Sequence, residues 1–359
     1  MRKFILPLLL ITAVFIGCQD SEVANPTDQQ TTIDMSDFFV YTELNAPKGD
    51  NGKDDKNCHS MNVLNRQLDE NPGLYKKMYD IEYASRKFIA SKKPDGKPGG
   101  GGGNGNGGGG DDGGGGTDPV DDGLGVINIP VYIHVVYSNS NENISDAQIN
   151  SQMQVLNDDF RRTNNDASNT PSEFATVAAD SEITFTLANT FRYSNTRTSW
   201  GTNDAVKAAY PPVTPETHMN IWVANIGGGI LGYAQFPGGN LATDGIVVSP
   251  QYFGTTGYVA APFDGGRTTT HEVGHYLNLR HIWGDGRCNR DDFVADTPRA
   301  DRPNYGCPTS AYHCRSNDQF MNYMDYTNDD CMNMFSLGQK DRMRSIFAAG
   351  GPRAAMIGS

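Results

Sequence analysis

The residues with the clearest potential for chemistry are the histidines and the glutamate in the run HEVGHYLNLRH, residues 271–281. On a helix, residues four apart lie on one face, so His271 and His275 can bind one metal ion together. Glu272 is then placed to take a proton from a water molecule on the metal. A zinc ion with three protein ligands and one open position lowers the pKa of its water towards about 7 and polarises a carbonyl. These residues predict one catalytic Zn²⁺ and a hydrolytic reaction.

A third histidine, His281, sharpens the prediction. In the extended motif H-E-x-x-H-x-x-G-x-x-H, the glycine ends the helix in a left-handed turn that brings the last histidine to the metal. Asn278 occupies the glycine position here. Asparagine is the non-glycine residue that best tolerates a left-handed backbone, so we expect the turn to form at modest strain. The alternative is three histidines without a metal.

The run NYMDY at residues 322–326 lies downstream of the histidines. It resembles the Met-turn of metzincin peptidases, in which the methionine, here Met324, lies beneath the zinc. A methionine that follows a tyrosine is otherwise an ordinary core residue. Tyr326 corresponds to the tyrosine that hydrogen-bonds the developing oxyanion in some metzincins, where loss of such a donor costs about 3 kcal/mol in the barrier.

The stretch from about Gly229 to Cys331 resembles the pappalysin family of metzincins, especially its secreted bacterial members. The matching pieces are GYAQFP at 232–237, GRT at 266–268, HEVGH at 271–275, DTP at 296–298, GCP at 306–308 and the Met-turn. The resemblance implies a secreted zinc endopeptidase with the α/β metzincin fold. In that fold, an N-terminal subdomain with a twisted, mostly parallel sheet and the active-site helix precedes a loop-rich, disulfide-stapled C-terminal subdomain with a terminal helix.

Four cysteines follow the histidine motif, and by themselves they allow three disulfide pairings. A zinc site of four thiolates is the alternative, but no C-x-x-C spacing supports it. The family resemblance implies the pairs Cys288–Cys314 and Cys307–Cys331.

The resemblance implies two further sites near the motif. One is a Ca²⁺ site at Asp292 and Thr297, whose oxygens suit a hard cation, with a solvated acidic loop as the alternative. The other is the pocket for the residue after the scissile bond, lined by an aspartate five residues after the Met-turn methionine, here Asp329. Its charge would favour Arg or Lys in the substrate, whereas the neighbouring Asp330 fits a surface charge.

Latency is also implied by the resemblance. Latent family members carry a pro-segment cysteine whose thiolate takes the open zinc position, and Cys58 is the unpaired candidate in this chain. Thiolate is a good zinc ligand and would displace the catalytic water. Because Asn57 and His59 flank Cys58 in place of the family's Arg and Gly, a free or intermolecularly paired cysteine is the alternative.

The N-terminus predicts export from the cytoplasm. Arg2 and Lys3 precede an apolar run too short to span a bilayer but suited to a signal peptide over residues 1–17. Gly17 before Cys18 resembles a bacterial lipoprotein signal, in which the cysteine is acylated. The alternative is ordinary secretion with Cys18 unmodified. We therefore expect an outer-membrane or cell-surface lipoprotein, attached through Cys18 only, or a released extracellular enzyme.

Three parts follow the signal peptide: a pro-segment over residues 18–97, a glycine-rich flexible linker over 98–125 and the catalytic domain over 126–359. Apolar spacing predicts two amphipathic helices in the pro-segment, broken at residues 71–73. In the catalytic domain, the patterns predict strands at 127–137, 182–193, 218–225 and 245–249, and helices after Ser145, at 267–279 and at 336–348.

Composition limits the partners and the rival functions. The formal net charge of −13 argues against nucleic acid as a partner, so protein or peptide substrates are expected. The sequence does not indicate the oligomeric state.

A zinc-stabilised adhesin or binding module is one rival function, but a structural metal site has no need of Glu272. A zinc amidase is the other, and the Met-turn argues against it.

Overall fold

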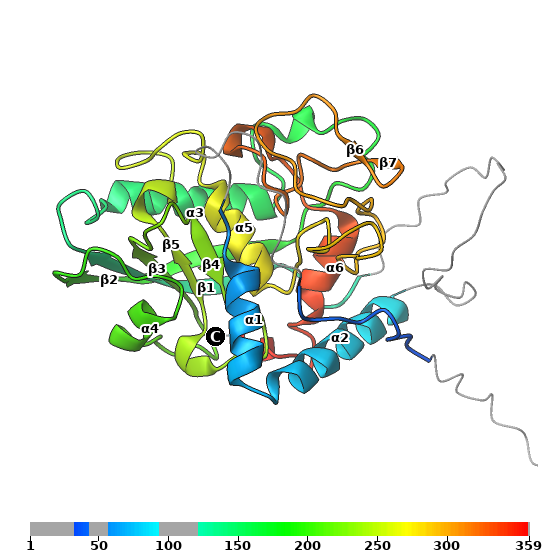
Figure 1. Ribbon diagram of the computed structural model, residues 1–359, viewed down its shortest axis with the longest axis horizontal. Coiled ribbons are helices and arrows are strands. Elements are labelled where there is room, and N and C mark those ends of the chain that lie inside the picture. Colours follow the sequence, from blue (N-terminus) through cyan, green and yellow to red (C-terminus); the bar gives the residue numbers. More distant parts are fainter. Residues whose placement is uncertain (1–31, 43–56, 93–120, 358–359) are drawn as a thin grey trace, which may run out of the picture. The chain divides into compact units, whose positions relative to one another are not determined.

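The computed structural model describes residues 32–42, 57–92 and 121–357, and the catalytic part is built on a mixed sheet (Figure 1). Among these residues the strand order is β2-β1-β3-β5-β4. The first four strands in that order pair in parallel, and β4 pairs antiparallel with β5. The strands are β1 (Ile127–Tyr137), β2 (Ile183–Ser194), β3 (Met219–Ala224), β4 (Gly232–Ala234) and β5 (Ile246–Val248). The predicted α/β fold with a mostly parallel sheet is confirmed.

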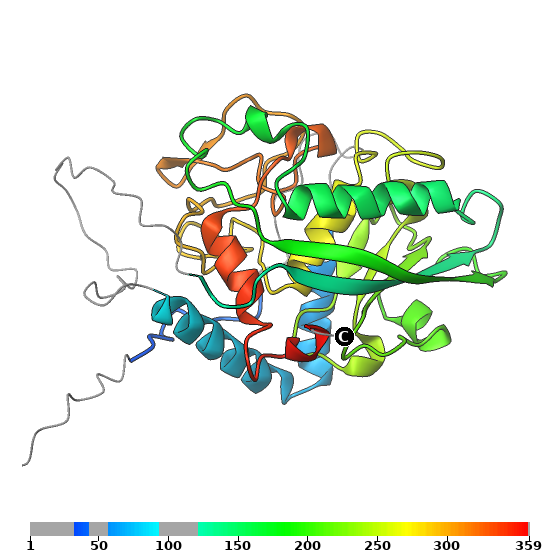
Figure 2. The same cartoon turned by 180° about the vertical axis from the view of Figure 1, so that it is seen from behind.

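Two helices pack near one another on the sheet. Helix α3 (Asp146–Phe160) lies along β2, as Figure 2 shows, and α5 (Arg267–Tyr276) contacts β4 and β5. The predicted cap of α3 is present, because the Ser145 hydroxyl accepts a hydrogen bond from the Gln148 amide at 3.2 Å. Burial of apolar residues three and four apart on α3 fixes this helix over the core, beside the helix that carries the histidines.

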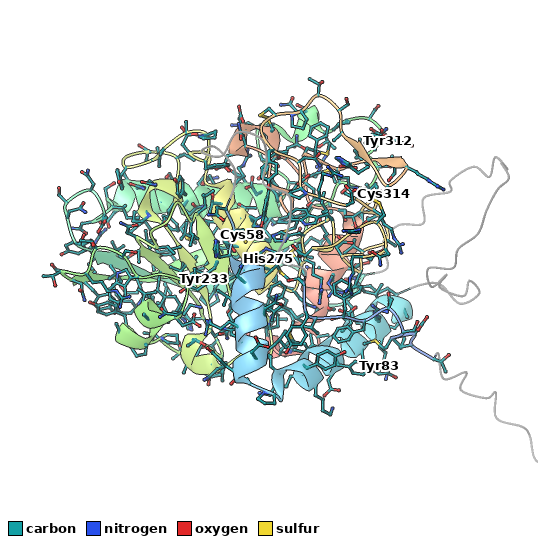
Figure 3. All side chains as sticks on the ribbon, in the orientation of Figure 1. Cys58, Tyr83, Tyr233, His275, Tyr312 and Cys314 are labelled. Carbon is teal, nitrogen blue, oxygen red and sulfur yellow. A yellow bond between two sulfur atoms is a disulfide. The ribbon has the colours of Figure 1, made fainter. Side chains whose placement is uncertain are left out.

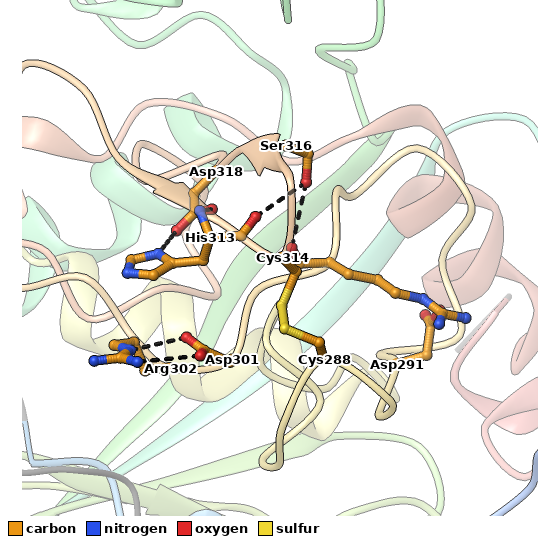
Figure 4. The surroundings of a disulfide bond; sticks show 9 residues. Cys288, Asp291, Asp301, Arg302, His313, Cys314, Ser316 and Asp318 are labelled. Atoms are coloured by element: carbon orange, nitrogen blue, oxygen red, sulfur yellow. Dashed lines mark hydrogen bonds and ion pairs between the residues drawn. A yellow bond between two sulfur atoms is a disulfide. The ribbon is translucent and has the colours of Figure 1, made fainter. Parts of the chain in front are cut away.

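The chain after α5 is rich in loops, as predicted. It contains the short strands β6 (Tyr312–His313) and β7 (Ser316–Asn317), and its α-helix is α6 (Leu337–Ser345), which begins with a capping box at Ser336. The structure has the disulfides Cys288–Cys314, shown in Figure 4, and Cys307–Cys331, so the pairing implied by the family is confirmed. The remaining short elements are α4 (Ala205–Ala209), η1 (Ala167–Asn169), η2 (Leu241–Thr243), η3 (Pro250–Tyr252), η4 (Asp329–Cys331) and η5 (Ala354–Met356).

The predicted pro-segment helices are present as α1 (Ser60–Glu70) and α2 (Leu74–Ser91), broken at residues 71–73. Helix α1 contacts β4, and α2 contacts α6. The second contact contains a buried ion pair, in which Arg342 Nη2 lies 2.6 Å from Glu82 Oε2. Both helices of the predicted pro-segment therefore lie directly on the predicted catalytic domain.

Three differences from the sequence analysis concern boundaries. Strand β4 lies between two predicted loops and was missed, because three residues are too few to show a strand pattern. Helix α5 ends at Tyr276, before the predicted Leu279. Asp122, in the predicted linker, forms an ion pair with Arg344 at 2.6 Å, whereas Cys18 and most of the linker lie outside the described residues.

None of the described helices is long and apolar enough to cross a membrane.

Candidate metal centre and active site

Three imidazole rings converge at the C-terminal end of α5. Each ring is held through Nδ1, which leaves its Nε2 atom to face the common centre, and the Nε2 atoms of His275 and His281 lie 3.1 Å apart. His271 Nδ1 bonds to the Tyr323 carbonyl at 2.7 Å, and His275 Nδ1 bonds to the Leu279 carbonyl at 2.9 Å. His281 Nδ1 bonds to the Asp285 carboxylate at 2.5 Å. Such bonds fix the tautomer that presents Nε2 to a metal.

The turn after α5 brings His281 to the other two histidines. Asn278 has a φ of 77°, which confirms the predicted left-handed conformation. Its amide donates to the His275 carbonyl at 3.0 Å, and the Leu279 amide donates to the Gly274 carbonyl at 2.9 Å, closing the helix. Asparagine therefore performs the backbone role of the motif's glycine.

Met324 lies buried against the histidine helix. A Cβ added at Gly274 would lie 2.3 Å from the Met324 sulfur, so only glycine permits this approach. The turn itself is held by Asn322, whose side-chain oxygen accepts from the Met324 amide at 2.9 Å. The predicted tight turn therefore packs beneath α5, on the segment that carries His271 and His275.

Cys58, from the predicted pro-segment, lies in the same centre. One ligand atom from each of Cys58, His271, His275 and His281 lies within 4.8 Å of the others, and all four side chains are buried. Figure 3 shows Cys58 next to His275. Burial, with the charge of Glu272 adding to it, raises the pKa of the Cys58 thiol well above its ordinary value. Three imidazole nitrogens and one sulfur form a donor set that suits tetrahedral zinc. The residues present therefore fit a zinc ion.

The backbone around Cys58 lies along strand β4. Cys58 forms a parallel β-bridge with Gly232, and the His59 amide donates to the Gly232 carbonyl at 3.1 Å. The Leu231 amide in turn donates to the Asn57 carbonyl at 3.1 Å. The pro-segment thus covers the edge strand next to the histidines, the kind of edge to which an extended peptide adds as a further strand.

Glu272 and Tyr326 both contact the pro-segment. Ser60, which the sequence analysis missed, donates from its hydroxyl to Glu272 Oε2 at 2.6 Å and accepts from the Ala234 amide at 2.7 Å. The Tyr326 hydroxyl donates to the Cys58 carbonyl at 3.4 Å, and burial raises the pKa of this phenol well above its usual range. Both predicted catalytic side chains therefore reach the centre, where Ser60 and the Cys58 carbonyl bond to their polar atoms.

A buried ionic network behind the histidines also escaped the sequence analysis. Asp159 accepts from the Tyr323 hydroxyl and the Thr270 hydroxyl at 2.8 and 2.7 Å, and its carboxylate pairs with Arg267 at 3.3 Å. Burial outweighs the favourable charge of Arg267 and raises the pKa of Asp159 to about 6. The network ties α3, α5 and the Met-turn together. Arg267 and Tyr323 lie in pieces that resemble the family, but nothing in the sequence links them to Asp159.

The other predicted site residues lie around this centre. Asp329, the first residue of η4, is buried against the N-terminus of α5. Its Oδ2 accepts hydrogen bonds from the amides of Gly265 and Arg267 at 3.1 and 3.0 Å. In a separate loop, the Thr297 hydroxyl lies 2.8 and 2.9 Å from the two carboxylate oxygens of Asp292 and 2.8 Å from the Val294 carbonyl. The structure thus groups Asp292 with Thr297 and places Asp329 beside the histidine helix.

Comparison with known proteins extends these observations. A family model described as pregnancy-associated plasma protein-A matches residues 201–348. An extracellular metalloprotease of Arthroderma otae is 31% identical over 233 residues, which cover 62% of this chain and 78% of the relative. The extracellular metalloprotease 1 of Coccidioides posadasii is 33% identical over 235 residues, covering 62% and 77%.

Solved structures of mirolysin from Tannerella forsythia are also similar to this chain. Mature mirolysin in complex with a cleaved peptide is 46% identical, with a TM-score of 0.63, over 65% of this chain and 96% of that one. A promirolysin variant is 38% identical, with a TM-score of 0.69, over 84% and 97%. Together with the histidine centre, these similarities show that the chain belongs to the pregnancy-associated plasma protein-A (pappalysin) family of metzincins and is a zinc metallopeptidase.

Proposed function

We propose that this chain is a secreted zinc endopeptidase made as a latent precursor. The observation that carries the proposal is the buried cluster of three histidine nitrogens and the Cys58 sulfur, with Glu272 hydrogen-bonded to Ser60 beside it. The cluster joins hydrolytic residues of the catalytic domain to two side chains of the predicted pro-segment. A structural metal site would need neither the glutamate nor its coverage by the pro-segment.

Each catalytic side chain has a distinct role in this proposal. His271, His275 and His281 hold the zinc, which supplies a Lewis acid for the substrate carbonyl and for water. Glu272 accepts the proton of the attacking water and passes it to the leaving amine. Tyr326 donates its hydroxyl hydrogen to the oxygen on which negative charge develops. In the precursor, Ser60 and the Cys58 carbonyl bond the last two groups, so release must precede turnover.

Release would follow cleavage in the linker, predicted over residues 98–125, because a glycine-rich tether is a preferred site of proteolysis. Cleavage alone leaves the pro-segment seated on β4 and on α6, where Glu82 pairs with Arg342. Departure of residues 57–60 would then uncover the edge of β4 for a substrate strand. This proposed order keeps the domain division of 18–97 as pro-segment and 126–359 as catalytic domain.

We also propose a structural Ca²⁺ at Asp292 and Thr297. The Asp292 carboxylate is fully buried, and this burial, with the charge of Asp291 adding to it, raises its pKa well above the ordinary value. The Thr297 hydroxyl and the Val294 carbonyl lie within hydrogen-bond distance of one another beside it. A hard cation bound by these oxygens would stabilise the ionised carboxylate.

Selective metal removal tests both ions. A zinc chelator should abolish hydrolysis of casein or gelatin by the activated enzyme, and added zinc should restore it. Calcium chelation should leave the zinc content unchanged and lower the thermal midpoint. Compared with protein in calcium at a hundred times its Kd, the free energy of unfolding should fall by about 2.7 kcal/mol. Hydrolysis that survives complete loss of zinc would contradict the zinc mechanism. An unchanged midpoint would contradict the calcium site alone.

The preference for a basic residue after the scissile bond is proposed through Asp329. Support comes from its place beside the start of the histidine helix and from its negative charge. We expect a peptide library to show Arg or Lys enriched at that position with the wild type, and this enrichment to disappear in Asp329→Asn. Asp330→Asn is the matched control, because Asp330 is the exposed neighbour with the same charge. Equal preferences in all three proteins would refute the assignment.

An extracellular location is proposed from the names of the fungal relatives, which are called extracellular metalloproteases. It agrees with the predicted signal peptide over residues 1–17. Attachment to a membrane through an acylated Cys18 stays a prediction, and the mass of the mature N-terminus decides between a lipoprotein and a released enzyme.

A further inference from the structure

We propose that Asp285 is a positioning residue of the metal centre, whose carboxylate fixes the His281 ring and strengthens it as a metal ligand. The inference rests on the proposed zinc function and concerns a residue outside the H-E-x-x-H motif. Its starting point is an asymmetry among the three histidines. His271 and His275 bond through Nδ1 to neutral backbone carbonyls, whereas His281 Nδ1 lies 2.5 Å from Asp285 Oδ1.

The difference between a carbonyl and a carboxylate matters chemically. Both accept the Nδ1 hydrogen and so leave Nε2 as the atom that faces the metal. Only the carboxylate carries a full negative charge, which makes the imidazole a more basic ligand and offsets part of the charge of a dication. Loss of such a partner typically lowers metal affinity by about 10- to 100-fold.

The His281 ring is fixed in both of its degrees of freedom. Trp283 stacks on it with centroids 4.3 Å apart and an interplanar angle of 5°, which sets the plane of the ring. Tyr326 meets it edge-on, with centroids 4.9 Å apart and an angle of 80°. Rotation within the stacked plane is still open to the ring, and the bond from Nδ1 to Asp285 stops it.

The turn over residues 281–286 is shaped to bring this carboxylate back onto His281. The Gly284 amide donates to the His281 carbonyl at 2.8 Å, and Gly284 has a φ of 60°. Asp285 follows with a φ of 52°, a conformation that non-glycine residues avoid unless the surroundings impose it. Its second oxygen, Oδ2, is buried and makes no hydrogen bond with any residue that the structure describes. The bond to His281 is therefore the contact that explains why an aspartate occupies this position.

The charge also bears on activation. In the proposed precursor, Cys58 would bind zinc as a thiolate, and this negative charge would leave with the pro-segment. Asp285 and His281 both belong to the predicted catalytic domain, and the bond between them involves no atom of the predicted pro-segment. Its contribution to zinc retention should therefore be present before and after activation.

Asp285→Asn tests the assignment, because asparagine keeps the size of the side chain, tolerates the left-handed backbone and removes the charge. Zinc affinity is measured by competition with a chromogenic chelator on the full chain and again after activation. We expect affinity to fall by about 10- to 100-fold in both forms and the absorption bands of the Co²⁺-substituted protein to shift. Zinc-free wild type and variant should have equal thermal midpoints.

A matched control lies in the same subdomain. His313 Nδ1 and Asp318 Oδ2 form a second pair at 2.5 Å, which Figure 4 shows, and neither residue belongs to the cluster of Cys58 and the three histidines. Asp318→Asn makes the same chemical change and should leave zinc affinity and the Co²⁺ spectrum unchanged. Wild-type affinity and spectrum in Asp285→Asn, or an equal loss in both variants, would overturn the assignment. Failure of the wild type to retain zinc would instead overturn the proposed function and the inference with it.

Discussion

Replacement of Glu272 by alanine in the activated enzyme should reduce peptide hydrolysis by roughly 10²–10⁴-fold while the zinc content stays at the wild-type level. The glutamate is next to a metal-binding histidine in sequence but contributes no atom to the four-residue ligand cluster. Its carboxylate instead bonds Ser60, a side chain that leaves with the pro-segment. The variant therefore removes the proton carrier and retains the metal, which separates catalysis from metal binding.

Two further variants make this experiment specific. Glu272→Gln preserves the volume of the side chain, so a loss equal to that of the alanine variant points to the missing base and not to a packing defect. Ser60→Ala alters the partner of Glu272 only in the precursor and should leave the activated enzyme at wild-type activity. Equal hydrolysis by wild type and Glu272→Ala would end the peptidase assignment and favour a binding module with a structural metal.

The features predicted correctly from the sequence depend on local spacing and backbone chemistry. Strand β1 has the predicted ends, because its alternation and β-branched residues are bounded by glycine and polar residues. The left-handed turn at Asn278 was predicted from the conformational tolerance of asparagine at the glycine position of the motif. The four site residues His271, Glu272, His275 and His281 meet because a helix and one turn are sufficient to bring them together.

The features that were missed depend on contacts between distant segments. Ser60 lies 212 positions before Glu272 and belongs to no motif, so nothing in the sequence links the two. Strand β4 forms through pairing with β5. A segment of three residues carries no sequence pattern that would predict this pairing. Asp285 acts through a tight turn whose geometry a loop-rich segment does not reveal. The role of Asp329 in substrate preference stays a prediction, since one of its carboxylate oxygens, Oδ2, accepts hydrogen bonds from the backbone amides of Gly265 and Arg267.

Cys58→Ala in the uncleaved precursor should raise peptidase activity by roughly tenfold or more over the wild-type precursor, which corresponds to at least about 1.4 kcal/mol of inhibition carried by the sulfur. Among the described residues of the pro-segment, Cys58 alone lies within the ligand cluster, and its removal would leave the metal with the three histidines as protein ligands. Activity should still stay below that of the cleaved enzyme, because Ser60 continues to bond Glu272 and the backbone at residues 57–59 continues to cover β4.

The double variant Cys58→Ala/Ser60→Ala distinguishes these two modes of inhibition. If the sulfur blocks the metal and the hydroxyl blocks the base, the double variant should be more active than Cys58→Ala alone, while Ser60→Ala alone stays latent. Cys58→Ser is the conservative control, since a hydroxyl of similar size is a poorer zinc ligand than a thiolate and should also release activity. Mass spectrometry must show an intact chain in each assay, because trace cleavage imitates activation. A fully latent, uncleaved Cys58→Ala precursor would show that the pro-segment inhibits by covering β4 and Glu272, with the sulfur as a bystander.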